Sequence, residues 1–170
     1  MRAESVRLLM QALSGGDVRF LVAGGLAVNA HGVLRFTMDV DLVIQLVPDN
    51  VKKAFEALEK INYRPTIPVT SEGFGDAQTR EKWIREKGMR VLRFHSDDHW
   101  ETPVDVFVEE PFVFNEEYEK AQVRTLAGGL TARVVSLDTL IEMKRKAGRP
   151  KDIGDLNDLA LRKKAYGDKA

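Results

Sequence analysis

The chain has 170 residues, of which 44% are hydrophobic and 31% are charged. This balance is typical of a soluble globular protein and excludes a wholly disordered one, and the length suits one domain with a proper core. Lysine and arginine together number 26, as do aspartate and glutamate, so the formal net charge is zero. With no global field to attract a polyanion, nucleic-acid binding would need a local basic patch.

The sequence lacks cysteine and long apolar runs, and each absence excludes further classes of protein. The sequence contains no cysteine, which excludes disulfides, thiolate metal sites and cysteine nucleophiles. The first residues, Met1 to Glu4, lack a hydrophobic signal core, and no apolar run approaches the roughly 20 residues of a membrane span. We therefore expect a cytoplasmic protein with no membrane partner.

Apolar periodicity predicts alternating helices and strands over the first sixty residues. The predicted elements are a helix at about 4–13, a strand at 18–23, a short helix at 26–31, a strand at 39–46 and an amphipathic helix over 51–58. Asp49 or Asn50 is the expected N-cap of the last of these helices.

The second half of the chain is predicted to continue the mixed pattern. The predicted elements are an edge strand at most in 63–69, a loosely attached polar helix at 76–87, strands at 89–94 and 102–108, a short helix at 115–121, a hairpin of 123–126 with 130–135, and helices at 137–147 and 153–164. Gly128-Gly129 is the expected hairpin turn. We predict one α+β domain over 1–170, in which a central mixed sheet carries packed helices and residues from about 136 to 165 form a C-terminal helical extension.

Three carboxylates carry the functional interpretation. Asp39 and Asp41 are two residues apart at the head of an apolar run, so on a strand both project to the same face. Asp105 lies in a second apolar run, between Val104 and Val106. Clustered carboxylates resist joint ionisation unless a cation neutralises them, and a hard dication with oxygen ligands suits them. If the two strands are neighbours, the three acids converge on one metal site.

A glycine pair precedes the acids. Gly24 and Gly25 stand where a strand pattern changes to a helix pattern. Without a Cβ, the backbone N–H groups can approach phosphate oxygens, and the following helix presents its positive end to the same anion. The pattern as a whole predicts a site for Mg²⁺ and a nucleoside triphosphate.

Each of these residues also has a plainer interpretation. The glycines can serve only as a tight strand-to-helix turn. Asp39 can cap or pair with a cation while Asp41 faces solvent on an edge strand, and Asp105 can be a strand-end acid paired with arginine or lysine. The joint pattern favours the nucleotide and metal site.

The glycine pair, the segment from Arg35 to Leu42 and the distant Asp105 together resemble the nucleotidyltransferase superfamily with the DNA polymerase β type of fold. Within it, the chain is similar to the group that includes the AbiEii-like toxins of type IV toxin-antitoxin systems and small bacterial relatives. The C-terminal residues extend the likeness, from Ser136-Leu137 to Lys144, then Arg149, Lys151-Asp152 and Asp155-Leu156.

The resemblance implies roles for particular residues. Asp39 and Asp41 would hold two Mg²⁺ ions, and Asp105 would ligate the catalytic ion and help to deprotonate the acceptor. Arg35 and Thr37 would support nucleotide binding.

Two C-terminal residues keep alternatives. Lys144 ends the apolar stripe of Leu137, Leu140 and Ile141, so it either reaches the triphosphate or extends its head to water. Asp152 is either a helix N-cap or an acid beside the nucleotide.

The expected function is Mg²⁺-dependent transfer of an NMP group from an NTP to a hydroxyl acceptor. The acceptor is an RNA 3′ end, a protein or a small molecule, and an antitoxin or a second copy of the chain would complete the site. The alternatives are a toxin of a type IV system, a catalytically silent nucleotide-binding or regulatory protein on the same fold, and a scaffold whose acids are merely solvated.

Overall fold

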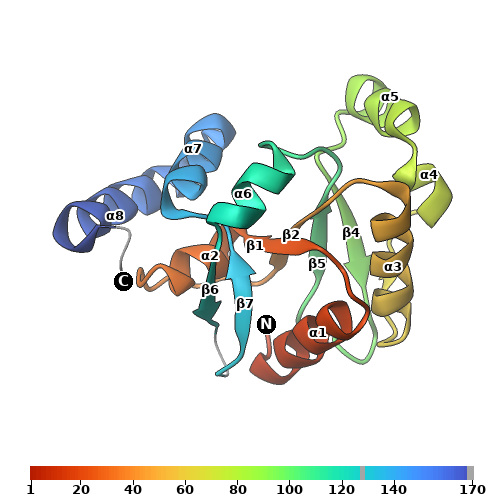
Figure 1. Cartoon of the computed structure of the whole chain (residues 1–170), viewed down its shortest axis with the longest axis horizontal. Helices are drawn as coiled ribbons and strands as arrows, with labels where there is room; N and C mark the ends of the chain where they lie inside the picture. Colours follow the sequence, from red (N-terminus) through yellow and green to blue (C-terminus); the bar gives the residue numbers. More distant parts are fainter. Residues whose placement is uncertain (127–128, 168–170) are drawn as a thin grey trace.

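The computed structural model describes residues 1–126 and 129–167, except for the side chain of Tyr166. The described residues form a mixed sheet with helices around it (Figure 1). The helices are α1 (Ala3–Gly15), α2 (Gly24–Ala30), α3 (Pro48–Glu59), α4 (Ser71–Gly75), α5 (Ala77–Lys87), α6 (Phe114–Lys120), α7 (Leu137–Ala147) and α8 (Pro150–Tyr166). The strands are β1 (Phe20–Ala23), β2 (Val40–Ile44), β3 (Arg64–Pro65), β4 (Val91–His95), β5 (Val104–Phe107), β6 (Gln122–Thr125) and β7 (Thr131–Val134).

The strand order in the sheet is β3-β4-β5-β2-β1-β7-β6. The pairs β2 with β5 and β1 with β7 are parallel, and the other neighbouring pairs are antiparallel. The central strands β1, β2 and β5 are the most buried, as their short apolar runs predict. The predicted central mixed sheet is therefore confirmed, and the two acid-bearing strands are direct neighbours.

The helices fall into two groups (Figure 1). α1 packs on α3, α3 on α4 and α4 on α5, whereas α2 contacts α7 and α7 contacts α8. Helix α5 buries only Arg80, whose Nη1 donates to the carbonyl of Phe74 at 2.6 Å. This agrees with the prediction of a loosely attached polar helix.

Two predicted helix boundaries were wrong. Neither Asp49 nor Asn50 caps α3, because Pro48 occupies its first turn and the helix begins from Val47. Asn50 instead lies buried, and its side chain bridges the backbone of Arg19 and Gln45. Likewise α8 begins at Pro150 rather than Ile153, for the same reason.

The sequence interpretation also missed one short helix, α4. The side chain of Thr70 caps it by accepting a hydrogen bond from the Gly73 N–H at 3.2 Å. Of the predicted hairpin turn, Gly129 has a φ of 78°, whereas Gly128 lies outside the described residues.

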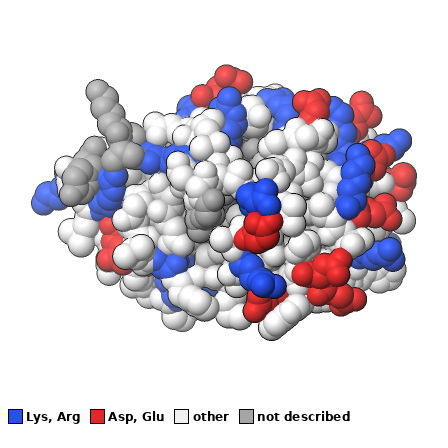
Figure 2. Space-filling view, turned by 90° about the horizontal axis from the view of Figure 1, so that it is seen from below, with Lys and Arg blue, Asp and Glu red and all other residues white. Residues whose placement is uncertain are grey.

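The surface carries charges of both signs. Figure 2 shows lysine and arginine side chains lying beside aspartate and glutamate over the face in view. Among the described residues, no helix combines the length and the apolar character needed to cross a lipid bilayer.

Candidate active site

The three predicted acids lie at one end of the central strands. Asp41 on β2 is the register partner of Asp105 on β5 and, on its other side, of Ala23 on β1. Directly paired residues project to the same face of a sheet, so the two carboxylates stand side by side. Asp39 lies two residues before Asp41, just ahead of β2. Because β2 is a central strand, the alternative that Asp41 faces solvent on an edge strand is wrong.

The electrostatics of Asp41 reflect this crowding. Burial raises the pKa of its carboxyl, and the negative charges of Asp39 and Asp105 raise it further, to about 6. The positive charges of Arg149 and Lys144 act in the opposite direction. A carboxyl in this state is stabilised by any added cation.

One such cation is already present. Arg93 on β4 is the register partner of Asp105, and its Nε and Nη2 donate to the two carboxylate oxygens of Asp105 at 2.7 and 2.6 Å. Its Nη2 also lies 3.7 Å from Oδ2 of Asp39. Asp105 therefore satisfies both interpretations made from the sequence, since it adjoins Asp41 and is also paired with an arginine.

The glycine pair is fitted to the acid site. Gly24 has a φ of 60°, and a Cβ built on it would lie 1.7 Å from Oδ2 of Asp41. A Cβ on Gly25 would lie 2.5 Å from Oγ1 of Thr37. These glycines are thus more than a turn, because each leaves space that a site residue fills.

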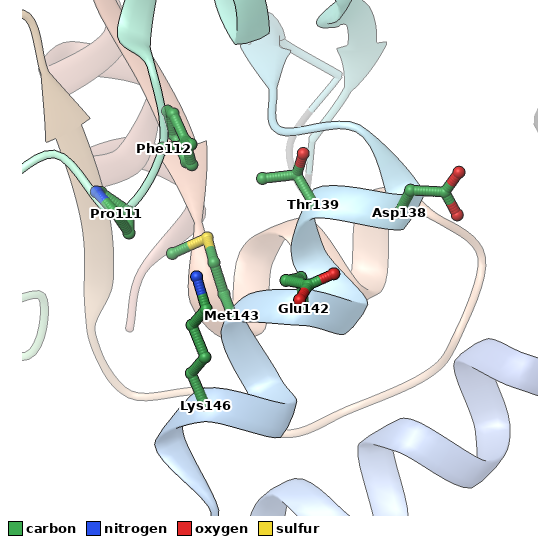
Figure 3. A pocket seen from close by; sticks show the side chains of 7 residues that line it. All are labelled: Pro111, Phe112, Asp138, Thr139, Glu142, Met143 and Lys146. Atoms are coloured by element: carbon green, nitrogen blue, oxygen red, sulfur yellow. The ribbon is translucent and has the colours of Figure 1, made fainter.

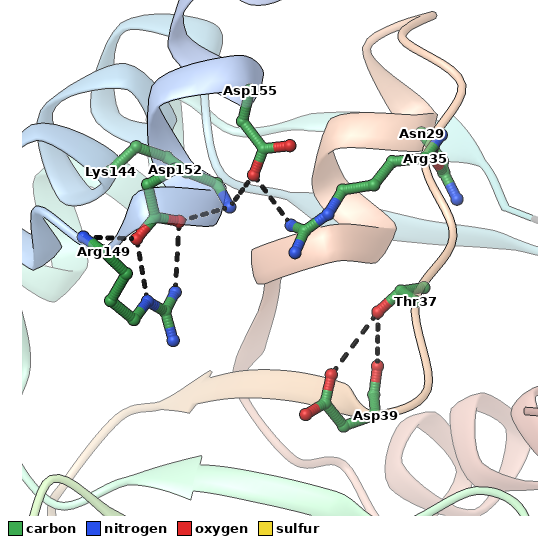
Figure 4. Close-up of polar contacts among 8 residues, drawn as sticks. All are labelled: Asn29, Arg35, Thr37, Asp39, Lys144, Arg149, Asp152 and Asp155. Atoms are coloured by element: carbon green, nitrogen blue, oxygen red, sulfur yellow. Dashed lines mark hydrogen bonds and ion pairs between the residues drawn. The ribbon is translucent and has the colours of Figure 1, made fainter.

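The segment that leads to Asp39 is extended, and its side chains alternate. Arg35, Thr37 and Asp39 are partly buried. The residues between them face solvent, with Leu34 100%, Phe36 83% and Met38 64% exposed. The Oγ1 of Thr37 donates to the carbonyl of Asp39 at 3.2 Å, and a further contact of 3.4 Å joins it to the carboxylate (Figure 4).

Helices α7 and α8 contribute a second charged cluster, drawn in Figure 4. The buried Nζ of Lys144 donates to Asp152 at 3.1 Å and to Asp155 at 2.6 Å. Asp155 also pairs with Arg35 at 2.9 Å, and Asp152 receives Nε of Arg149 at 2.7 Å. Through the pair of Arg35 and Asp155, this cluster is tied to the segment before the acids.

The structure alters the interpretation of two residues in this cluster. The head of Lys144 does not extend to water, since the residue is 3% exposed and its ammonium lies between two carboxylates. Asp152 is not the N-cap of α8; Arg149 takes that position, and the Asp152 carboxylate accepts from the Arg149 backbone N–H at 3.2 Å from three residues into the helix. Burial would raise the pKa of Asp152, but hydrogen bonds from Arg149 and Lys144 lower it to about 2.

Sequence reasoning missed Arg93 and assigned no site role to Asp155. The alternating burial of β4 shows that Arg93 shares a face with Val91 and His95, a pattern visible in the sequence. Which strand lies opposite β4 is a matter of sheet pairing, and no local pattern gives it.

A separate cavity of about 290 Å³ lies along one face of α7 (Figure 3). None of the three acids lines it. Its lining residues are Pro111, Phe112, Asp138, Thr139, Glu142, Met143 and Lys146.

The carboxylates of Asp39, Asp41 and Asp105 have the oxygen donors that a hard dication prefers, and burial together with the two neighbouring acids raises the pKa of Asp41. Over residues 1–126 and 129–167, however, no three acidic or histidine side chains are gathered closely enough to hold a metal ion as they stand. The three carboxylates are thus chemically suited to a divalent cation, but both oxygens of Asp105 now accept hydrogen bonds from Arg93.

Solved structures with the same arrangement of elements define the fold class. ANT(2″)-Ia in complex with adenylyl-2″-tobramycin superposes with a TM-score of 0.62 at 15% identity, covering 94% of this chain and 87% of that one. Lincomycin-bound LnuA, a lincosamide antibiotic adenylyltransferase, gives 0.63 at 12% identity, covering 94% and 97%. An antigenic nucleotidyltransferase-like protein from Paracoccidioides brasiliensis gives 0.54 at 17%, covering 94% and 74%. These likenesses show the nucleotidyltransferase fold.

The family follows from the sequence itself. The family model described as "Nucleotidyl transferase AbiEii toxin, Type IV TA system" matches residues 7–169. The chain therefore belongs to the AbiEii nucleotidyltransferase family and is a nucleotidyltransferase, which confirms the resemblance noted in the sequence. No curated protein matches the sequence.

Proposed function

We propose that this protein transfers an NMP group from an NTP to an acceptor hydroxyl in a Mg²⁺-dependent reaction at Asp39, Asp41 and Asp105. The observation that supports it most is the pairing of Asp41 with Asp105 on adjacent strands, beside a glycine that must lack a Cβ for Asp41 to fit. Family membership supports the reaction class.

Asp39 and Asp41, with Asp105, are the residues that would hold Mg²⁺. When bound, the ions would neutralise charge on the attacking and leaving oxygens of the in-line displacement. The displacement forms a bond between the acceptor oxygen and the α-phosphorus and breaks the bond from that phosphorus to pyrophosphate. Asp105 would accept the proton of the acceptor hydroxyl, which is the role of a positioned carboxylate in general base catalysis.

The other site residues would bind and orient the nucleotide. Gly24 and Gly25 leave a surface without Cβ atoms on which phosphate oxygens can approach the backbone. Arg35 and Thr37 belong to the segment that carries Asp39 into the site, and Arg35 offers a guanidinium for phosphate.

Lys144 and Asp152 remain predicted nucleotide-site residues, acting from the α7–α8 cluster. Lys144 already lowers the pKa of Asp41 by its charge. To touch the triphosphate, its ammonium would have to leave Asp152 and Asp155.

The family also supports a toxin role, with an antitoxin as partner. Cellular RNA, whose 3′ end carries a hydroxyl, is the first acceptor class to test. Small-molecule acceptors are the second class to test, because a structural neighbour was solved with adenylyl-2″-tobramycin. The third class is a protein hydroxyl. A second copy of the chain is the alternative partner.

The test is label transfer from each of the four NTPs carrying a radioactive α-phosphate, with Mg²⁺ and, separately, cellular RNA, cellular protein and aminoglycosides. We expect labelled acceptor with the wild type and at least a hundredfold less with Asp41→Asn, because that carboxylate cannot be replaced by an amide. Asp17→Asn is the matched control, since Asp17 is 90% exposed, lies outside the site and has a positive φ that asparagine tolerates.

The acceptor fraction that takes the label identifies the acceptor class. Transfer that survives Asp41→Asn would refute the assigned mechanism. Binding of Mg²⁺ and a non-hydrolysable NTP without any transfer would favour the catalytically silent alternative, and failure to bind either would favour the scaffold.

A further inference from the structure

Arg93 places a positive charge directly on the acid site. The side chain of Asp105 is 8% exposed, and the guanidinium reaches both of its oxygens in a two-pronged contact of 2.7 and 2.6 Å. Such a fork is among the strongest contacts available to a carboxylate. Asp105 is therefore fully engaged in this state of the protein.

The same guanidinium serves the other two acids. It lies 3.7 Å from Asp39, and the charges of Asp39 and Asp41 add to the hydrogen bonds that Arg93 donates to Asp105 in raising the pKa of Arg93. Three carboxylates this close repel one another in the absence of a cation. Arg93 supplies the compensating charge from the neighbouring strand.

We propose that Arg93 is a resident counter-cation that holds Asp105 in the metal-free protein and is displaced from it when a divalent metal and an NTP bind. The proposal rests on the proposed function, because it needs the acids to be the metal ligands. An ion at about 2.1 Å from an oxygen of Asp105 would lie within about 5 Å of the guanidinium nitrogen that donates to the same oxygen. Two positive charges at that distance repel strongly at a partly buried site.

The exposure of the two partners indicates which one moves. The side chain of Arg93 is 49% exposed, whereas that of Asp105 is 8% exposed. The long arginine side chain can turn into water at little cost, but Asp105 is fixed on a central strand. Displacing Arg93 therefore frees the oxygens of Asp105 without moving the sheet.

Direct competition can be measured without catalysis. Calorimetric titration with Mn²⁺ is carried out on the wild type, Arg93→Gln, Asp41→Asn and Arg85→Gln. The last is the matched control, because Arg85 is an exposed arginine paired with Glu86 on α5. We expect Arg93→Gln to bind Mn²⁺ roughly tenfold or more tightly than the wild type, since a competing charge within about 5 Å of the ion is gone. Arg85→Gln should match the wild type.

A second readout is the thermal midpoint in EDTA. It should fall in Arg93→Gln, because three carboxylates then lack their cation, and saturating Mn²⁺ should raise it more than in the wild type. Arg93→Lys, which keeps the charge but loses the fork, should lie between the two in Mn²⁺ affinity.

The outcomes separate this proposal from the proposed function. If the wild type binds Mn²⁺ and Asp41→Asn does not, but Arg93→Gln binds with unchanged or weaker affinity, Arg93 is no competitor and this inference alone is overturned. If neither the wild type nor Arg93→Gln binds Mn²⁺, the metal role of the acids is overturned as well.

A measurement on the wild type covers the case in which Arg93→Gln fails to fold. The Nε–H resonance of Arg93, assigned by nuclear magnetic resonance, should shift and lose its protection from solvent exchange when Mg²⁺ and α,β-methylene ATP are added. An unchanged resonance at saturation would show that the fork persists, which contradicts the proposal.

Discussion

Gly24 is where one missing methyl group matters most to the acid site. Its φ of 60° matches that of Gly88, which is 62°, but a Cβ on Gly88 would meet no atom within 4 Å. On Gly24 the same atom would overlap the carboxylate of Asp41. Comparing alanine substitutions at the two glycines therefore separates the energetic cost of a left-handed backbone from the energetic cost of moving Asp41.

We predict that Gly88→Ala lowers the free energy of unfolding by about 1 kcal/mol and leaves transfer unchanged. Gly24→Ala should cost about 1–2 kcal/mol more and reduce transfer by about a hundredfold, because Asp41 is displaced by the order of 1 Å. Urea unfolding and the label-transfer assay measure the two effects. Equal losses of stability in both variants would show that displacing Asp41 costs no free energy.

Asp41 and Asp152 are predicted to affect stability in opposite directions. The folded pKa of Asp41, about 6, lies above its unfolded value near 3.9. The folded protein therefore binds more protons between pH 4 and 6, and the free energy of unfolding falls as the pH rises through that window. For Asp152, with a folded pKa of about 2, stability is present above pH 4 and is lost as the pH falls toward 2.

Replacement by asparagine makes this difference measurable in EDTA. At pH 7.5 we expect Asp41→Asn to raise the free energy of unfolding by about 1–3 kcal/mol, and Asp152→Asn to lower it by about 3 kcal/mol. Near pH 4 the gain from Asp41→Asn should largely vanish. Urea unfolding at both pH values checks this, and a loss of stability in Asp41→Asn at pH 7.5 would contradict the raised pKa of Asp41.

At the scale of elements, α7 and α8 are held together by two lysines in different surroundings. Lys144 reaches from α7 to Asp152 and Asp155 in the interior, and Lys163 reaches from α8 to Asp138 at the surface. Removing one partner of a buried ion pair leaves an unpaired charge, whereas an exposed pair contributes little.

We predict that Lys144→Met lowers the free energy of unfolding by about 3–5 kcal/mol, and that Lys163→Met changes it by less than about 1 kcal/mol. Denaturant unfolding of both variants is the measurement. If Lys144→Met were as stable as the wild type yet bound NTP more weakly, Lys144 would serve the nucleotide rather than the helix pair.

At the scale of the whole molecule, the parallel pairing of β2 with β5 decides where the acids lie. More than sixty residues separate Asp41 from Asp105 along the chain. Strand β4 lies between them in sequence, but in the sheet it lies beside β5, on the side away from β2. The strand order thus places Arg93, Asp105 and Asp41 in one row. The division of 1–170 into one domain with a helical extension stays a prediction.

The class of protein and most of its elements were predictable from the amino-acid sequence alone. The spacing of apolar residues located the long helices and the apolar strands, because an element that buries one face repeats apolar residues at a fixed interval in the local sequence. The spacing of Asp39 and Asp41 likewise placed both on one face. The α3 and α8 boundaries were wrong where a proline at the first turn outweighed the polar residues read as caps.

Which charged side chains meet depends on how the strands pair and the helices pack. The fork of Arg93 on Asp105 depends on the antiparallel register of β4 with β5, and the burial of Lys144 depends on the packing of α8 against α7. The contact of Gly24 with Asp41 depends on the pairing of β1 with β2. Each of these contacts joins residues that are far apart in sequence or lie on separate elements. Contacts of this kind produce no periodic pattern in the sequence, so local patterns cannot predict them.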